Sequence, residues 1–273
     1  LKNKNIIVAF TGDEEKPGSP LTVSRRDLIE AAKKSDIALG FETASGMHHA
    51  TVARRGSSGW QLEVKGTQAH SSGIFSENVG AGAIFEAARI LNSFYTDVKG
   101  EELLTFNPGV ILGGTQVDYD PGQAKGTAYG KTNVVASELV VHGGLRFISE
   151  EQKENARNKM REIVNKNLPG TSASISFSDS YPAMNPTDGN MALLKVLDRV
   201  SRDLGHGQVE AYDPGRRGAA DISFIAQYVD GLDGLGVMGG GAHSPSETID
   251  LRTLTPLTER AALLIHRLGS AQK

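Results

Sequence analysis

The feature of this chain that most constrains its fold is an apolar stretch, residues 6–10, that runs directly into the sequence Thr-Gly-Asp-Glu-Glu. A short apolar run closed by a turn residue predicts a buried strand. Open α/β folds bind ligands outside the carboxyl ends of their strands, which is where Glu14 and Glu15 then lie. Because consecutive residues of an extended chain point to opposite sides, one carboxylate can bind a metal while the other handles the protons of a water molecule. The pair favours hydrolysis, although acidic residues after a strand are more often a solvated turn.

Two later segments repeat this pattern. Residues 37–42 read as a second buried strand that ends in Glu42, and an apolar run from residue 234 leads through a glycine-rich turn to His243. Two glutamates and a histidine at three strand ends make a ligand set that suits zinc better than calcium or magnesium. The sequence therefore favours a zinc site over a solvated acidic turn.

The composition excludes several classes of protein. The net charge of −3, with both signs interspersed, gives no basic patch for nucleic acid. No apolar stretch approaches the roughly 18 residues of a membrane span. The chain has no cysteine, which excludes disulfides and thiol catalysis, and it has no Gly-x-Ser-x-Gly motif of a serine hydrolase. A length of 273 residues allows two domains of ordinary size.

The pattern of elements changes twice along the chain, which predicts one domain inserted into another. Residues 1–53 and 182–273 read as α/β, with helices at residues 25–34 (capped by Ser24), 189–204, 220–228 and 258–268. Residues 54–181 read as strand 59–65, helix 78–95, strands 103–112 and 138–147, helix 149–167 (capped by Ser149) and strand 173–178. This β-α-β-β-α-β order is that of ferredoxin-like folds.

Together these motifs resemble a family of dinuclear zinc metallopeptidases and deacylases, which includes glutamate carboxypeptidase, aminoacylase, carnosinase, tripeptidase and succinyl-diaminopimelate desuccinylase. The resemblance covers nearly the whole chain. It implies an α/β catalytic domain of the zinc-peptidase type with an inserted ferredoxin-like α+β lid or dimerisation domain. It further implies that Glu14 is the general base, that Glu15 and His243 bind one zinc ion, and that Glu42 binds the other.

In the inserted domain the resemblance singles out three residues. His70, in a Gly-x-x-Ala-His segment, is expected to reach the active site of a partner subunit and stabilise the oxyanion. Asn133 is expected to contact substrate, although Ala136 replaces the proline of that family motif. Arg146 is expected to bind a substrate carboxylate, although Gly144 replaces the aspartate that accompanies it. The expected role of His70 implies a homodimer through the inserted domain.

A glycine-rich loop around Arg217 and Gly218 corresponds to a family loop that binds substrate. A loop of this kind that opens a helix offers free backbone N–H groups to an anion. The same residues also read as an ordinary helix start, with Asp221 near the positive end of the helix dipole. The two interpretations have equal weight.

The family's His-x-Asp motif and its metal-bridging aspartate lie upstream of the Gly-Asp-Glu-Glu strand, and this chain begins a few residues before that strand. We therefore expect an incomplete catalytic domain that binds zinc weakly or partially, where a complete enzyme would bind two ions. The predicted function is zinc-dependent hydrolysis of a peptide or an N-acyl amino acid, carboxypeptidase-like or deacylase. The alternative is a non-catalytic dimerisation or binding fragment, and the sequence indicates no compartment.

Overall fold

The computed structural model describes residues 4–270, and the chain divides into two compact units. Unit 1 combines Leu1–Gly56 with Tyr181–Lys273, and unit 2 is Ser57–Ser180. The sequence placed these divisions after residues 53 and 181. Each unit has its own hydrophobic core and is described by itself.

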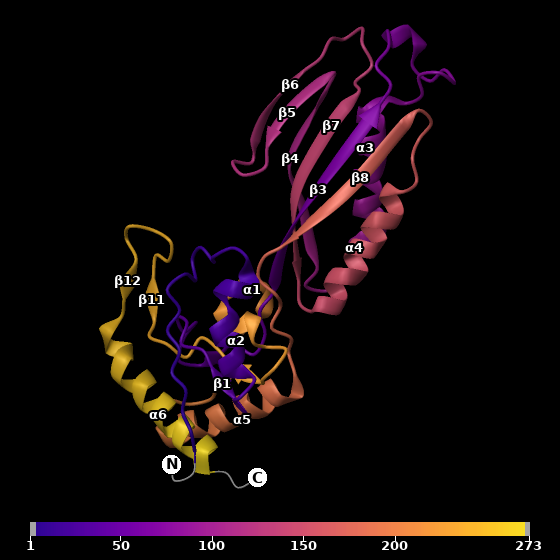
Figure 1. Ribbon diagram of the computed structural model, residues 1–273. Coiled ribbons are helices and arrows are strands. Elements are labelled where there is room, and N and C mark those ends of the chain that lie inside the picture. The colour runs from indigo at the N-terminus through magenta and orange to yellow at the C-terminus, as the bar shows by residue number, and fades with distance from the viewer. Residues whose placement is uncertain (1–3, 271–273) are drawn as a thin grey trace. The chain divides into compact units, whose positions relative to one another are not determined.

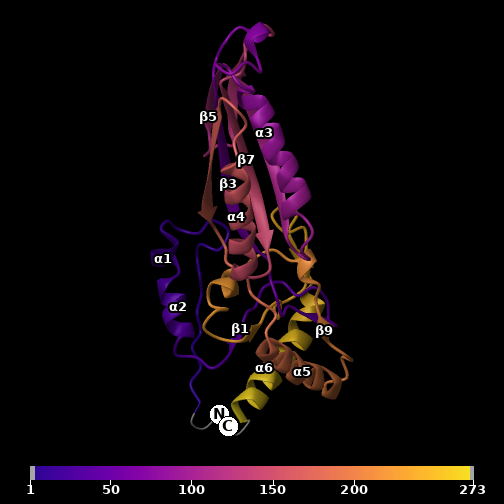
Figure 2. The same ribbon diagram turned by 90° about the vertical axis from the view of Figure 1, so that its right-hand side faces the viewer.

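Unit 2 is a four-stranded sheet covered on one face by two helices (Figures 1 and 2). The helices are α3 (Gly82–Ser93), which continues into a π-helical turn, η2 (Phe94–Val98), and α4 (Glu150–Val164). The strands are β3 (Gly56–Gly66), β4 (Thr105–Gly114), β7 (Glu138–Phe147) and β8 (Thr171–Asp179), in the spatial order β4-β7-β3-β8. This order, with the sequence order β-α-β-β-α-β, confirms the ferredoxin-like fold.

The side chains on the helix-covered face of the sheet are alternate residues of each strand. Along β3, Trp60, Leu62 and Val64 are buried, and the residues between them are more exposed. Alternate residues of a strand point to opposite faces, so these three side chains all meet the helices. On α3, Ala87 and Ile90 are fully buried. Ser149 caps α4 as expected, because its hydroxyl oxygen accepts the N–H of Gln152.

A hairpin that the sequence did not indicate lies between β4 and β7. It consists of β5 (Gln116–Asp120) and β6 (Lys125–Tyr129), which pair antiparallel. The hairpin packs against β7, since Tyr119 bonds the ring of His142 and the Glu138 carboxylate accepts the N–H of Val117. Every residue of β6 is exposed, so the segment lacks the apolar alternation from which a strand is predicted.

Unit 1 is built mostly from helices and loops joined by very short strand pairs (Figure 1). Its helices are α1 (Leu21–Ser24), α2 (Arg26–Ala32), α5 (Asp188–Asp203) and α6 (Leu254–Ser270). Its parallel pairs are β1 (Ala38–Leu39) with β10 (Gly231–Leu232) and β2 (His49–Ala50) with β9 (Glu210–Ala211), and its antiparallel pair is β11 (Gly239–Gly240) with β12 (Thr248–Ile249). Short 3₁₀ turns complete the chain: η1 (Ser71–Gly73) in unit 2, and η3 (Pro214–Arg216), η4 (Asp221–Phe224) and η5 (Leu251–Thr253) in unit 1.

The strands predicted for unit 1 are largely wrong. Residues 6–10 form no strand, and Phe10 is 94% exposed. Residues 37–42 contribute only Ala38–Leu39, and residues 234–238 form none. A strand needs a hydrogen-bonded neighbour, and the described residues supply none for residues 6–10.

Two helix predictions for unit 1 also need correction. The helix expected at residues 25–34 is α1 followed by α2, with Arg25 between them. Ser24 does not cap it, because its hydroxyl donates to Asp13 instead. The helix expected at residues 220–228 is only the single turn η4.

Candidate functional site

Glu14 and Glu15 lie in an irregular turn of unit 1 that Asp13 organises. One carboxylate oxygen of Asp13, Oδ2, accepts the N–H of Gly18 at 3.1 Å and the hydroxyl of Ser24 at 2.9 Å. The other, Oδ1, lies 2.6 Å from Nη1 of Arg25. The backbone N–H of Gly18 and these neighbours hold the pKa of Asp13 below its ordinary value. The turn is therefore closed by a charged side chain and not by a strand end.

Glu15 meets His243 although the two residues come from opposite ends of the chain. Nδ1 of His243 lies 3.1 Å from Oε2 of Glu15, and both side chains are about three-quarters exposed. His243 follows β11 with φ of +61°, a conformation that costs a residue with a Cβ atom and that recurs at functional sites. The structure thus brings together two of the residues that the sequence singled out.

Glu42 follows β1 and is half-buried among charged groups. Burial raises the pKa of Glu42 and the carboxylate of Asp233 raises it further, while Arg54 and Arg217 oppose these effects. Burial also raises the pKa of Glu14, and the nearby charges of Glu42 and Glu15 add to the increase. The carboxylate of Glu14 therefore lies close enough to those of Glu42 and Glu15 to be repelled by both, and a bound cation would relieve this repulsion.

The donors present fit a metal ion only in part. Two ligands of one tetrahedral zinc, each at about 2.0 Å from the metal, lie roughly 3.3 Å apart. The separation of 3.1 Å between Glu15 and His243 is close to that value. Among residues 4–270, however, no group of three histidine, aspartate or glutamate side chains converges on one point. Glu15 and His243 could thus hold two positions of a zinc ion, and the described residues offer no third.

No sequence motif marked Arg54 and Asp233, which form a buried ion pair beside Glu42. Nε of Arg54 lies 2.7 Å from Oδ2 of Asp233, and both side chains are almost completely buried. Oδ1 of Asp233 accepts the N–H of Glu42 at 3.4 Å, and Nη1 of Arg54 donates to the carbonyl of Gly218 at 2.8 Å. The pair thereby links the Glu42 segment to the glycine-rich loop. Arg54 lay at an expected domain boundary, where no motif marked it.

Arg217 points toward the Glu42 segment and not into solvent. Its Nη2 donates to the carbonyl of Thr43 at 2.6 Å, and its Nε lies 3.4 Å from the hydroxyl of Thr51. Burial lowers the pKa of Arg217, and the neighbouring Arg54 lowers it further. Two guanidinium groups beside several carboxylates give this part of unit 1 both signs of charge.

In unit 2, His70 and Asn133 lie together. His70 forms a β-bridge with Val134, and the carbonyl of Asn133 accepts the N–H of Ser71 at 2.9 Å. The ring Nδ1 of His70 lies 2.8 Å from the hydroxyl of Ser72. The structure therefore places these two residues at one end of the sheet, close to the start of β7.

Arg146 lies at the opposite end of β7. It pairs with Thr105 of β4 and is exposed, whereas Ser137, just before β7, bonds the Gly66 end of β3 near His70. Eight residues of strand at about 3.3 Å each separate Glu138 from Arg146 by roughly 26 Å. Within one unit 2, His70 and Arg146 are thus too far apart to contact the same small substrate.

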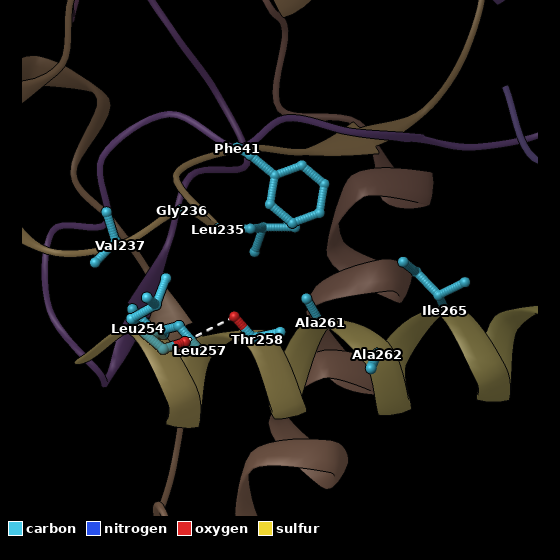
Figure 3. Close-up of a pocket in the computed structure, with 10 residues that line it drawn as sticks. All are labelled: Phe41, Leu235, Gly236, Val237, Leu254, Leu257, Thr258, Ala261, Ala262 and Ile265. Atoms are coloured by element: carbon cyan, nitrogen blue, oxygen red, sulfur yellow. Dashed lines mark hydrogen bonds between the residues drawn. The ribbon is translucent and has the colours of Figure 1, made fainter. Parts of the chain in front are cut away.

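One hollow in the described part of unit 1 is apolar and contains none of the charged site residues. It has a volume of about 400 Å³ and is lined by Phe41, Leu235 and the face of α6 that carries Leu257, Ala261 and Ile265 (Figure 3). Its lining contains no ionisable group, so it offers no acid, base or metal ligand.

Comparison with known proteins places these features in a family. The peptidase dimerisation domain of the M20 family matches residues 52–172, which include nearly all of unit 2. A succinyl-diaminopimelate desuccinylase of Herminiimonas arsenicoxydans is 27% identical over 253 residues, which are 91% of this chain and 62% of that protein.

Solved structures share the fold. An aminopeptidase of Bacillus cereus superposes with a TM-score of 0.65 at 20% identity, over 89% of this chain and 61% of that one. A dinuclear metal-binding M20 peptidase of Bacillus subtilis superposes with a TM-score of 0.61 at 16% identity, over 94% of this chain and 64% of that one. The chain thus spans about three-fifths of the length of these relatives.

These matches define the chain as a relative of peptidases and deacylases that carry an inserted dimerisation domain. Residues 52–172 match the dimerisation domain of the M20 peptidases, which confirms the resemblance seen in the motifs. No helix among residues 4–270 is long and apolar enough to cross a membrane.

Proposed function

We propose that the whole protein hydrolyses an amide or peptide bond with the help of two zinc ions, as a carboxypeptidase or an N-acyl-amino-acid deacylase. The observation that carries this proposal is the convergence of Glu15 and His243 beside Glu14 and Glu42. Bound zinc would lower the pKa of a water molecule toward ~7 and polarise the scissile carbonyl. In this chain Glu15 and His243 would hold one ion, and Glu42 would bind the other.

Glu14 is the proposed general base. It is adjacent to Glu15 in the turn that Asp13 closes, and it is part-buried where Glu15 is exposed. A raised pKa makes a carboxylate a stronger base, and burial raises the pKa of Glu14. Glu14 would accept a proton from the attacking water and deliver it to the leaving amine, a role worth roughly a hundredfold to ten-thousandfold in rate.

Arg217, with the backbone of Gly218, is proposed to bind the α-carboxylate of the substrate, and Arg146 is proposed as a second carboxylate ligand. Arginine forms two parallel hydrogen bonds with a carboxylate, which fixes orientation as well as binding. This substrate class agrees with a desuccinylase relative, whose name implies an N-acyl amino acid. Peptides with a free carboxyl end have the same group.

His70 and Asn133 are proposed to act on the site of a second copy. The distance along β7 between these residues and Arg146 prevents all three from contacting one substrate within one unit 2. A histidine from the partner can instead donate a hydrogen bond to the developing oxyanion, which is typically worth about 3 kcal/mol. The homodimer is then necessary for activity.

The surface proposed for this dimer lies where α3 packs against the edge strand β4. Ile84 and Phe85 on α3 and Ile111 on β4 are each more than half exposed, and Phe75 contacts Phe85. Ile111 pairs with Val141, so it is on the helix-covered face of the sheet, the same face as α3. Exposed apolar patches of this kind mark interfaces, and two-fold dimers are the commonest oligomers.

The dimer can be tested without activity. In light scattering after size exclusion, the chain should be a dimer at tens of micromolar, and Ile84→Glu should give a folded monomer. Tyr95→Glu is the matched control, since Tyr95 is as exposed but lies in η2 at the other end of the helix. A wild-type monomer with unit 2 folded would contradict both the interface and the role of His70 in a partner site.

The catalytic proposal is tested by metal binding and hydrolysis together. Zinc titration of the 273-residue chain should show weak binding that Glu15→Gln and His243→Ala abolish. In a protein with the full length of its relatives, Glu14→Gln should retain two zinc ions and lower kcat by about a hundredfold or more. If the Glu14→Gln enzyme is active, Glu14 is not the general base. If the variant loses zinc, Glu14 is the metal ligand and Glu15 is the base.

A non-catalytic dimerisation module is the second candidate. The absence of a third converging donor among residues 4–270 favours it. This candidate predicts that a chain as long as its relatives binds no zinc and cleaves neither peptides nor N-acyl amino acids. Zinc titration and hydrolysis assays of a chain as long as its relatives therefore separate the two candidates.

A further inference from the structure

Arg25 is a charged side chain with no exposure to solvent, placed between α1 and α2. A buried guanidinium is costly unless every part of it is paired. Its Nη1 lies 2.6 Å from Oδ1 of Asp13, and its Nη2 donates to the carbonyl oxygen of Asp13 at 2.9 Å. Its Nε lies 3.0 Å from Oδ1 of Asp221. These contacts reach two segments that are far apart in sequence.

The first segment is the turn that carries Glu14 and Glu15. Arg25 contacts both the side chain and the backbone of Asp13, the residue that closes this turn through Gly18. The hydroxyl of Tyr181 donates to the carbonyl of Glu14, which fixes the next peptide unit as well. The Asp13–Glu14 peptide and the Glu14–Glu15 peptide are therefore both held by side chains from outside the turn.

The second segment begins at Asp221, just after the loop of Arg217 and Gly218. Both carboxylate oxygens of Asp221 are buried without a hydrogen bond from the described residues, so the ion pair with Arg25 compensates their charge. The guanidinium of Arg25 also lies over the ring of Phe224, 5.1 Å from its centre, at the end of the same 3₁₀ turn. The Phe224 ring in turn packs on Tyr181, with ring centres 4.9 Å apart.

We infer that Arg25 is a positioning residue, which holds the Glu14–Glu15 turn in register with the segment that starts at Asp221. The inference rests on the proposed function, in which the first segment carries the general base and a metal ligand. The second segment follows the loop that is proposed to bind the substrate carboxylate. Arg25 itself touches neither metal nor substrate. It acts by fixing where Glu15 lies relative to His243, and Glu14 relative to Arg217.

The neighbouring Arg26 provides a matched control. Its side chain is 66% exposed, and its ion-pair partner Asp27 is 90% exposed. Arg25→Met and Arg26→Met therefore remove the same charge from adjacent residues, one buried and one in water. Arg25→Lys retains the charge, but a single ammonium nitrogen cannot occupy the three positions from which Nη1, Nη2 and Nε of Arg25 reach Asp13 Oδ1, the Asp13 carbonyl and Asp221.

The experiment uses cobalt(II) as the metal probe and hydrogen exchange as a second measurement. In the 273-residue chain, Arg25→Met should weaken cobalt binding by about tenfold or more and change the visible absorption bands of the bound ion. Arg26→Met should match wild type, and Arg25→Lys should not restore the bands. A variant that is only less stable would have a lower melting temperature with an unchanged spectrum of the folded, metal-bound protein.

Hydrogen exchange keeps this test independent of the proposed function. The Gly18 amide, bonded to Asp13, should exchange faster in Arg25→Met than in Arg26→Met, while amides of β3 remain as in wild type. If wild-type chain binds no cobalt, the metal part of the proposed function fails, and exchange alone decides the inference. If Arg25→Met does not fold, Arg25→Lys and Asp13→Asn take its place. Equal Gly18 exchange in the Arg25 and Arg26 variants would overturn the inference.

Discussion

The two units of this chain use different means to place functional residues. The four-stranded sheet of unit 2 has strands of nine to eleven residues, and strand ends and backbone pairing position His70 and Asn133. Unit 1 has paired strands of only two residues each. Its acidic residues are placed by buried arginines, Arg25 and Arg54, that pair with aspartates. A sheet can position a site through backbone pairing, whereas loops need side-chain contacts to do the same.

The largest expected effect tests whether the two units are also separate in stability. Leu62 of β3 is fully buried in unit 2, so Leu62→Ala should lower the free energy of unfolding by about 2–5 kcal/mol. The single tryptophan, Trp60, lies in the same core and reports this transition by fluorescence. Leu232→Ala is the control, since Leu232 is equally buried in unit 1. If Leu232→Ala shifts the Trp60 transition as far, the units unfold together and the comparison fails.

A second change targets the close contacts on which unit 1 depends. A Cβ atom at Gly40 would lie 2.3 Å from Oδ1 of Asp233, which is buried and paired with Arg54. Gly40→Ala must therefore displace this pair and should destabilise unit 1 by about 1–3 kcal/mol. Gly12→Ala meets no atom within 4 Å and should be nearly neutral. Hydrogen exchange of unit 1 amides measures the stability change in each variant. Equal protection in the two variants would show that the Arg54–Asp233 pair moves aside at little cost.

This difference between the units also explains what the sequence could predict. In unit 2 the periodicity of β3, β7 and α4 reflects burial against one core, so β7 was predicted at its observed bounds and the Ser149 cap was correct. The β5–β6 hairpin escaped prediction because β6 is wholly exposed and β5 has only two partly buried residues, Val117 and Tyr119. In unit 1, residues 6–10 have the apolar pattern of a strand, yet the described residues give them no strand to pair with.

The candidate site shows the same division. Motifs identified Glu14, Glu15, Glu42 and His243, and the structure brings Glu15 to His243. No motif identified Arg25, Arg54 or Asp233, because their role depends on contacts between segments far apart in sequence. A local pattern records which side chains can react, but it does not record which buried charges hold them in place.

A third prediction uses an ion pair at the edge of unit 2, where the sheet alone does not fix the side chains. Asp179 of β8 lies 2.6 Å from Nη2 of Arg157, which is buried on α4, and 3.4 Å from the ammonium of Lys153. Asp179→Asn should cost about 1 kcal/mol at pH 7, a modest value because Asp179 is more than half exposed and water screens the pair.

The pH dependence of this effect follows from the direction of the pKa shift. Burial alone would raise the pKa of Asp179, but the hydrogen bond from Arg157 and the charge of Lys153 outweigh it and bring the pKa below its ordinary 3.8. The stabilisation is therefore complete above about pH 4 to 5 and is lost as the pH falls through the folded-state pKa. Urea titrations at pH 7 and in acid should show the difference between wild type and Asp179→Asn shrinking. A difference that grows in acid would contradict the sign.

The smallest expected effect compares equivalent caps in the two units. Ser149 caps α4 in unit 2 by accepting the N–H of Gln152 at 3.0 Å, and Thr187 caps α5 in unit 1 by accepting the N–H of Asn190 at 3.0 Å. The Thr187 hydroxyl also donates to Asp230 at 2.6 Å, a tie to another segment that Ser149 lacks. Ser149→Ala should therefore cost about 0.5–1 kcal/mol, and Ser149→Asp, which caps equally well, should cost almost nothing.

Thr187→Ala should cost more than Ser149→Ala, because it removes the cap and also leaves Asp230 without that donor. Thr187→Ser keeps the hydroxyl and removes only the methyl group, so its cost shows how much of the Thr187→Ala effect comes from the methyl group. Urea unfolding read by Trp60 fluorescence for unit 2, and by amide exchange for unit 1, gives the two costs. If Thr187→Ala costs no more than Ser149→Ala, the tie to Asp230 contributes nothing.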